Sequence, residues 1–217
     1  MRRPDYYSHM SKNVYPLYIL FHPVDGFREM KVNNKFSLAF ANGVLVLWVL
    51  FGILDWGYVD FDFKTSFRQL EGDINIFQVL LTTVLIFSIS VLSNWCFCTL
   101  MDGKGKMKEI WIAGAYAMMP YVLLGILRVG LTHVMTADEA SYLAYLDTIG
   151  VIWSALLVFL ALMIIHDYSA FKTVGSILLT LCGVLIIGFL VVLVSGLVSQ
   201  IYSFFATIYF ELKLRYL

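Results

Sequence analysis

Residues 36–54, FSLAFANGVLVLWVLFGIL, decide how the chain must fold. This run holds 19 uncharged residues between Lys35 and Asp55, and a helix needs roughly 20 apolar residues to cross ~30 Å of hydrocarbon. Over all 217 residues, 60% are hydrophobic and only 14% are charged, and the mean hydropathy is +0.82. A soluble domain of this length needs more charged residues to cover its surface. The composition therefore predicts a membrane protein.

Four further uncharged runs predict the remaining crossings. They hold 28, 18, 18 and 38 residues and lie between Asp73 and Asp102, Glu109 and Arg128, Asp147 and His166, and Lys172 and Glu211. We expect an all-α polytopic membrane protein with a bundle of five transmembrane helices. The expected spans are about 36–54, 76–100, 110–127, 148–165 and 173–196. Residues 1–35 then form a cytoplasmic N-terminal segment, and 36–217 form the transmembrane domain.

The last uncharged run is nearly twice as long as one crossing requires. Two crossings would need a turn, yet residues 185–210 contain no Pro, Asn or Asp, and their only glycines are Gly188 and Gly196. Glycine alone is tolerated in membrane helices. We therefore expect one helix that continues past its span to about residue 210, leaving the bilayer or bending along its surface.

The basic residues predict the orientation. Ten of the 15 Lys and Arg residues lie in the N-terminal segment and in the second and fourth connections. Five spans place these segments on one side of the membrane, and cytoplasmic loops are enriched in Lys and Arg. We expect a multi-pass protein of the cytoplasmic membrane, with its N-terminus in the cytoplasm and its C-terminus outside.

The turn DGKGKMKE, residues 102–109, could be taken for a phosphate-binding loop. A Walker-type loop needs a glycine five residues before its Gly-Lys pair and a Ser or Thr after it, and neither pair here has them. We expect no bound nucleotide. Gly103 and Gly105 are instead expected to permit φ > 0 in a tight cytoplasmic reversal.

The sequence contains none of the common catalytic motifs. The sequence has no HExxH or GxSxG, and its four histidines lie in different connections or in the N-terminal segment. No Asp, Glu, Lys or Arg lies inside an expected span, which argues against a proton relay or an ion-coupled carrier. The formal net charge is zero, so the chain has no overall basic field for nucleic acid. We expect no catalytic residue, no cofactor, no metal site and no nucleic-acid partner.

The segment before the first span, YPLYILFHPVDGFREMK, predicts an amphipathic helix. Its apolar residues recur at i, i+3 spacing and its bases flank that face, which suits an in-plane helix on anionic headgroups. A soluble helix packed beneath the bundle is the alternative. The expected membrane-surface residues are Tyr15, Tyr18, Phe21, Phe27, Arg28 and Lys31.

Two features of the later spans concern helix packing. Pro120 should kink the third span, either for architecture alone or to shape a cavity. The last helix carries small and polar residues mostly four apart, which allow close helix contacts. They serve packing within the same bundle or a partner helix in another subunit. The stripe consists of Gly188, Ser195, Ser199, Ser203 and Thr207.

Several of these stretches resemble the Yip family (Ypt/Rab-interacting membrane proteins). They are FHPVDGFREM at residues 21–30, and the Gly-Lys turn followed by KEIWIAGAYAMMPYVL at 108–123. The likeness covers roughly residues 15–200 and implies a five-helix bundle with no established enzymatic activity. Eukaryotic relatives act in Golgi and endoplasmic-reticulum trafficking and bind prenylated Rab proteins or each other. This chain lacks their long polar cytoplasmic tail and looks like the bacterial branch, some members of which sit beside sugar transport systems.

Together these features favour a non-enzymatic accessory or scaffold subunit of a membrane complex, such as an ABC-type sugar importer. Its expected partners are the lipid bilayer and other integral membrane subunits, in a hetero-complex or a homo-oligomer. One alternative is a small transporter or channel-forming oligomer, suggested by a Pro120 kink beside Ser93 and Asn94. Another is a membrane-trafficking or membrane-shaping factor like the eukaryotic relatives.

Overall fold

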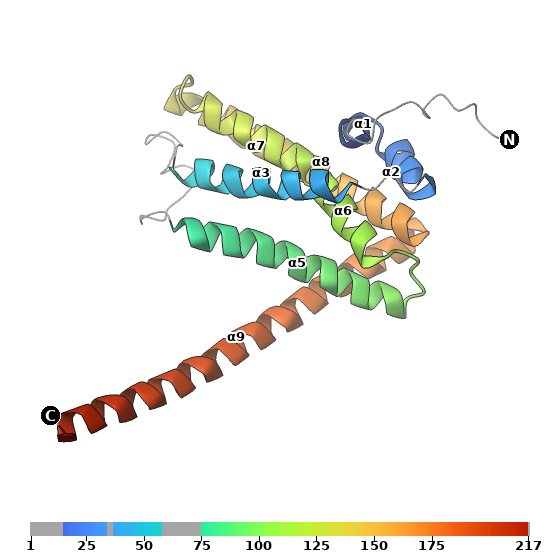
Figure 1. Cartoon of the computed structure of the whole chain (residues 1–217). Coiled ribbons are helices and arrows are strands. Elements are labelled where there is room, and N and C mark those ends of the chain that lie inside the picture. The colour runs from blue at the N-terminus through green and yellow to red at the C-terminus, as the bar shows by residue number, and fades with distance from the viewer. Residues whose placement is uncertain (1–14, 34–36, 58–74, 217) are drawn as a thin grey trace.

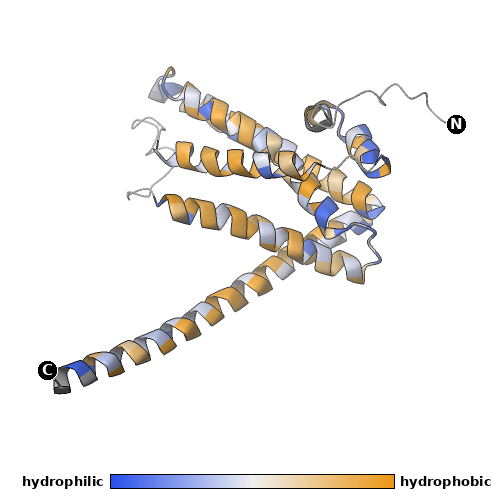
Figure 2. Ribbon diagram, viewed as in Figure 1, coloured by the Kyte–Doolittle hydropathy of each residue, from blue (hydrophilic) through white to orange (hydrophobic). Residues whose placement is uncertain are grey.

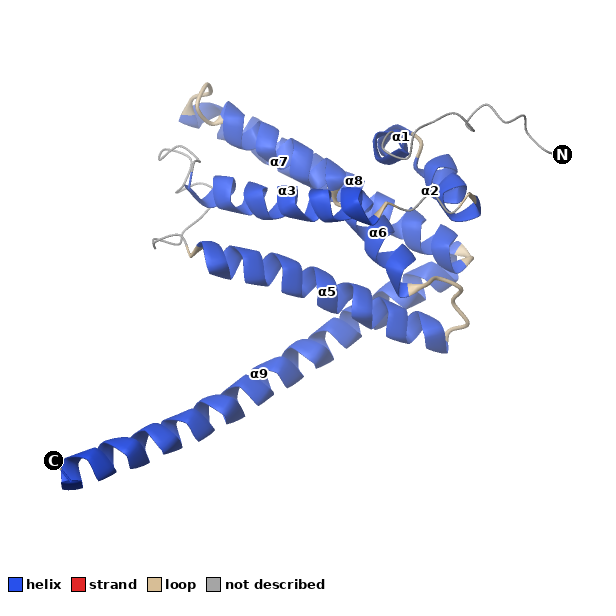
Figure 3. Ribbon diagram, viewed as in Figure 1, coloured by secondary structure: helices blue, strands red, loops and turns tan. Residues whose placement is uncertain are grey.

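The computed structural model describes residues 15–33, 37–57 and 75–216 of the chain, and every regular element in these ranges is helical (Figures 1 and 3). The elements are α1 (Tyr15–Phe21), α2 (Pro23–Val32), α3 (Leu38–Gly57), α5 (Ile76–Leu100), α6 (Met107–Ala117), α7 (Met119–Leu131), the 3-10 turn η1 (Ala137–Glu139), α8 (Ala140–His166) and α9 (Ala170–Tyr216).

Five helical stretches are long and apolar enough to cross a membrane, as the sequence predicts. They are Leu38–Gly57, Ile76–Leu100, Met107–Leu131, Ala140–His166 and Ala170–Glu211. The third stretch lies at the centre of the bundle. In its apolar 18-residue segment 56% is buried, whereas only 6% of the corresponding segment of the last stretch is buried. Apolar residues run along these helices, and polar residues gather near their ends (Figure 2). Many of the large apolar side chains are exposed. This distribution suits a lipid surround.

The third stretch is broken into α6 and α7 at Met118, two residues before Pro120, where the sequence predicts a kink. Proline has no N–H to donate within the helix, so the regular bonding pattern stops there. The N–H of Tyr121 donates instead to Ser154 Oγ of α8, at 3.1 Å. The break in one helix is thus stabilised by a hydroxyl from its neighbour.

The last helix, α9, is one continuous element of 47 residues, with no turn inside it. Its first turns pack against α5, where Gly183 lies close to Ser93 and Phe97. Beyond this crossing α9 leaves the bundle and extends away from it (Figure 1). The expectation of one long helix is confirmed, and the helix continues past residue 210 to Tyr216.

Candidate functional site

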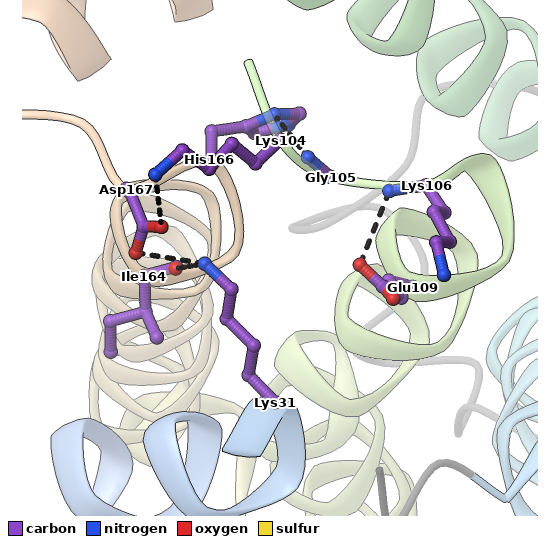
Figure 4. Close-up of polar contacts among 8 residues, drawn as sticks. All are labelled: Lys31, Lys104, Gly105, Lys106, Glu109, Ile164, His166 and Asp167. Carbon is purple, nitrogen blue, oxygen red and sulfur yellow. Dashed lines mark hydrogen bonds and ion pairs between the residues drawn. The ribbon is translucent and has the colours of Figure 1, made fainter.

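Polar side chains gather at both ends of the bundle. We call the first group the His166 cluster: Lys31, Asn94, Gly103, Lys104, Gly105, His166, Asp167 and Tyr168 (Figure 4 shows part of it). It forms where α8 ends and the chain turns into α9. Asp167 takes a left-handed conformation, with φ 56°, and the N–H of Tyr168 donates to the carbonyl of Met163 at 3.0 Å. These bonds satisfy the last carbonyls of α8.

The α5–α6 turn packs directly on this helix end. A Cβ on Gly103 would lie 2.6 Å from His166 Nδ1 and 2.5 Å from the Tyr168 hydroxyl, and one on Gly105 would lie 2.7 Å from His166 Cε1. The expected positive φ at these glycines is absent from the described residues, where only Asp102 and Asp167 have φ above zero. The turn therefore needs glycine for space and not for backbone conformation.

His166 lies at the centre of the cluster and is only 1% exposed. The N–H of Gly105 donates to its Nδ1 at 3.3 Å, and its Nε2 lies 3.2 Å from Asn94 Oδ1. Its ring stacks on Tyr168, with the centroids 5.2 Å apart. The hydroxyl of Tyr168 donates to the carbonyl of Cys98 at 3.1 Å, and burial raises the pKa of this tyrosine.

Lys31 ties α2 to the same place. Its ammonium group donates to the carbonyl of Ile164 at 2.9 Å and pairs with Asp167 at 2.8 Å. Lys104 of the turn approaches the other oxygen of Asp167 at 3.4 Å. The hydrogen bond from Lys31 holds the pKa of Asp167 below its usual value, because it stabilises the carboxylate. One carboxylate thus joins α2, the α5–α6 turn and the end of α8.

The residues expected at the membrane surface divide into two groups. Phe27 is fully buried, and Lys31 is engaged with α8, so this face of α2 packs on the bundle as in the alternative interpretation. Arg28 is exposed, Phe21 is 75% exposed, and Tyr18 is half-buried and stacked on His22. The side chain of Tyr15 lies outside the part of the chain that the structure describes.

A second group, which we call the Arg128 cluster, lies at the other end of the bundle and joins α3, α7 and α8. Arg128 of α7 is 3% exposed and bonds through Nη2 to the carboxylate of Asp55 of α3. Its Nε lies 2.9 Å from Asp147 Oδ1 of α8. These charges lie inside membrane-length helices, which corrects the expectation that no charged residue does so. Their mutual pairing offsets the cost of burying them.

The Arg128 cluster is absent from the sequence-based expectations, although the sequence contains a signal for it. Asp55, Arg128 and Asp147 each stand where an apolar run begins or ends. In a five-span chain those three boundaries fall on the same side of the membrane, so opposite charges there can meet. The apolar runs stop at these charges, but the helices continue past them.

The stripe on α9 lies on the part of this helix that extends beyond the bundle (Figure 1). Ser195, Ser199, Ser203 and Thr207 are exposed, and no atom of another element lies within 4 Å of a Cβ built on Gly188. Three of the hydroxyls donate to carbonyls of α9 itself, from Ser195 to Val192, from Ser203 to Ser199 and from Thr207 to Ser203. Packing of the stripe within the bundle is therefore not observed, and a contact with a partner stays a prediction.

Ser93 and Asn94 were expected beside the Pro120 kink, but their side chains contact α9. Ser93 Oγ donates to the carbonyl of Thr180 at 2.8 Å, and Asn94 Nδ2 donates to the hydroxyl of Thr180 at 3.0 Å. These two side chains thus fasten α5 to α9 and do not combine with the Pro120 break. Among the described residues, no group of three or more His, Cys, Asp or Glu could hold a metal ion.

Five membrane-length helices, with a polar cluster at each end of the bundle, define a multi-pass integral membrane protein. The Yip1 domain family matches residues 17–193, which is most of the chain, and the protein belongs to this family. The match runs from α1 into α9 and includes every residue of both clusters. No curated protein and no solved structure matches the chain. Four stripe residues, Ser195, Ser199, Ser203 and Thr207, lie beyond the matched region.

Proposed function

We propose that this Yip-family member is a non-enzymatic accessory or scaffold subunit of a membrane complex, and that α9 is its contact element. The observation that carries the proposal is the separation of α9 from its own bundle. Only 6% of its apolar 18-residue segment is buried within the protein, although this helix is the most apolar of the five. A helix that packs so little within its own subunit is free to pack against another.

The length of α9 supports a contact beyond lipid. Its apolar part, Ala170–Glu211, holds 42 residues and is about 63 Å long at 1.5 Å per residue, against a hydrocarbon core of ~30 Å. A tilt at the upper end of the usual range leaves roughly 15 residues surplus. The surplus carries exposed aromatic side chains, among them Tyr202, Phe205 and Phe210. Exposed to water these would form a large apolar patch, so a partner subunit is a suitable cover.

The partner we propose is another integral membrane subunit, and an ABC-type sugar importer is the specific complex suggested by the resemblance to bacterial relatives. We place the protein in the cytoplasmic membrane with its N-terminus in the cytoplasm. The clustering of Lys104, Lys106, Lys108 and Lys172 at the end that holds α2 supports this orientation. The transporter alternative gains no support from Ser93 and Asn94, because both are engaged with α9.

The double substitution Ser199→Leu with Ser203→Leu tests the contact. It should reduce recovery of an associated integral membrane protein after purification from native membranes in mild detergent, because bulky side chains prevent close helix approach. Gln200→Leu is the matched control, since it also replaces an exposed polar residue on α9 but lies off the stripe. A photo-crosslinker at position 199 should label the same protein. Unchanged recovery with the double variant, together with no crosslinked protein, would refute the proposal.

A further inference from the structure

A chain of hydrogen bonds runs through the His166 cluster from one backbone group to another. The N–H of Gly105 donates to His166 Nδ1 at 3.3 Å, and His166 Nε2 lies 3.2 Å from Asn94 Oδ1. Asn94 Nδ2 donates to the hydroxyl of Thr180 at 3.0 Å, and that hydroxyl donates to the carbonyl of Ser176 at 2.8 Å. These hydrogen bonds link the α5–α6 turn, the end of α8, α5 and α9.

The backbone groups at the two ends of this series of hydrogen bonds fix the position of every proton in it. A backbone carbonyl only accepts, so the hydroxyl of Thr180 donates to Ser176 and accepts from the amide nitrogen of Asn94. The oxygen of Asn94 therefore faces His166, and Nε2 of the imidazole must be the donor. At the other end the backbone N–H of Gly105 only donates, so Nδ1 must carry a lone pair. The ring fits here only as the neutral Nε2–H tautomer.

We propose that His166 is a proton-operated latch, and that uptake of a proton at Nδ1 releases the α5–α6 turn from the end of α8. A proton on Nδ1 would point at the N–H of Gly105, so two donors would face each other where one hydrogen bond had been. The turn lies too close to the ring for water to enter between them, as the Cβ distances at Gly103 and Gly105 show. The turn must move for the new N–H to find an acceptor.

The ammonium groups of Lys31 and Lys104 act in the same direction. The titratable and charged groups on the elements packed around His166 are Lys31 of α2, Cys98 of α5, Asp102 and Lys104 of the α5–α6 turn, Asp167 and Tyr168 of the α8–α9 connection, and Lys172 of α9. Asp167 is already engaged with Lys31 at 2.8 Å and approached by Lys104 at 3.4 Å. An imidazolium would add a positive charge beside these ammonium groups, and repulsion favours movement of the turn.

Proton uptake accompanies the movement of the turn, which lets water reach Nδ1, and a hydrated imidazole changes its charge between about pH 5 and 8, a range that cells reach. Release would uncouple the turn while the Asn94–Thr180 bond keeps α5 fastened to α9. The movement is therefore confined to residues 103–109, which include the first residues of α6. It does not depend on the contact proposed for α9.

Hydrogen exchange of the full-length protein in lipid nanodiscs tests the latch. After correction for intrinsic exchange, protection of residues 103–109 should fall roughly tenfold between about pH 7.5 and pH 5.5, the loss expected for one hydrogen bond. His166→Gln should show equal protection at both pH values, because glutamine has no proton to gain. His133→Gln is the matched control, since His133 is exposed at the other end of the bundle, and it should keep the wild-type response.

A second variant keeps the test decisive if His166→Gln does not fold. Asn94→Asp replaces the acceptor of the Nε2 proton with a carboxylate, which stabilises the imidazolium and should move the release to a higher pH. Nitrogen-15 spectra of labelled histidine should show the Nε2–H tautomer at about pH 7.5. Equal protection of wild type at both pH values, a response that persists in His166→Gln, or a proton on Nδ1 at the higher pH would each overturn the latch.

Discussion

The two ends of the bundle join their helices by different means. The His166 cluster uses backbone groups, an imidazole and glycines that allow close approach, with its one carboxylate at the surface. The Arg128 cluster uses three full charges on three helices. Helix α8 takes part in both, through Asp147 near its start and His166 at its end. The His166 end therefore depends on close packing and the Arg128 end on charge balance, so substitutions should destabilise the two ends to different extents.

The largest loss of stability is expected at the Arg128 cluster. Arg128→Met leaves the carboxylates of Asp55 and Asp147 without the guanidinium between them, and should lower the free energy of unfolding by about 3 kcal/mol. This is the low end for a buried pair, because the side chain of Asp147 is 34% exposed. Chemical unfolding of the purified protein in detergent micelles measures it.

Lys213→Met provides the control for Arg128→Met, because Lys213 is an exposed base on α9. It should leave the unfolding free energy nearly unchanged. Adding Asp55→Asn and Asp147→Asn to Arg128→Met should recover part of the loss, since no uncompensated charge then remains. If Arg128→Met and Lys213→Met unfold alike, charge balance does not hold this end together.

A smaller loss is expected from crowding at the His166 cluster. Gly105→Ala places a methyl group 2.6 Å from Ile165 Cγ2 and 2.7 Å from His166 Cε1, and should cost about 1–3 kcal/mol through overpacking. Gly130→Ala is the matched control, because no atom outside its own helix lies within 4 Å of a Cβ there. It should be neutral or slightly stabilising, since alanine favours helix. Equal melting temperatures for the two variants would show that the turn does not pack on His166.

The sequence predicted the five spans and the single last helix because both follow from the spacing of charges. It did not predict what surrounds each residue. The spacing of Val24, Phe27 and Met30 identifies an apolar face, but the same face suits lipid or protein, and the bundle covers Phe27 and Met30 while Val24 stays exposed. Gly103 and Gly105 marked a turn correctly, whereas their need for space depends on His166, 61 positions beyond Gly105 in the chain.

The Yip1 domain match and the structure divide α9 at nearly the same place. The matched region ends at residue 193, shortly after the turns that pack on α5. The part shared with the family is therefore the bundle with its two clusters. The exposed end of α9 is the part of this helix on which the proposed partner contact rests, and that contact has to be tested on this chain itself.

Cysteine labelling tests most directly whether the two clusters lie on opposite faces of the membrane. Lys106→Cys and His133→Cys report on the two ends, since both positions are exposed. The natural Cys96 and Cys182, which are also exposed, are first replaced by serine. In intact cells a membrane-impermeant maleimide should label position 133, and it should label position 106 only after permeabilisation. Labelling of both positions in intact cells, or of position 106 alone, would contradict this arrangement.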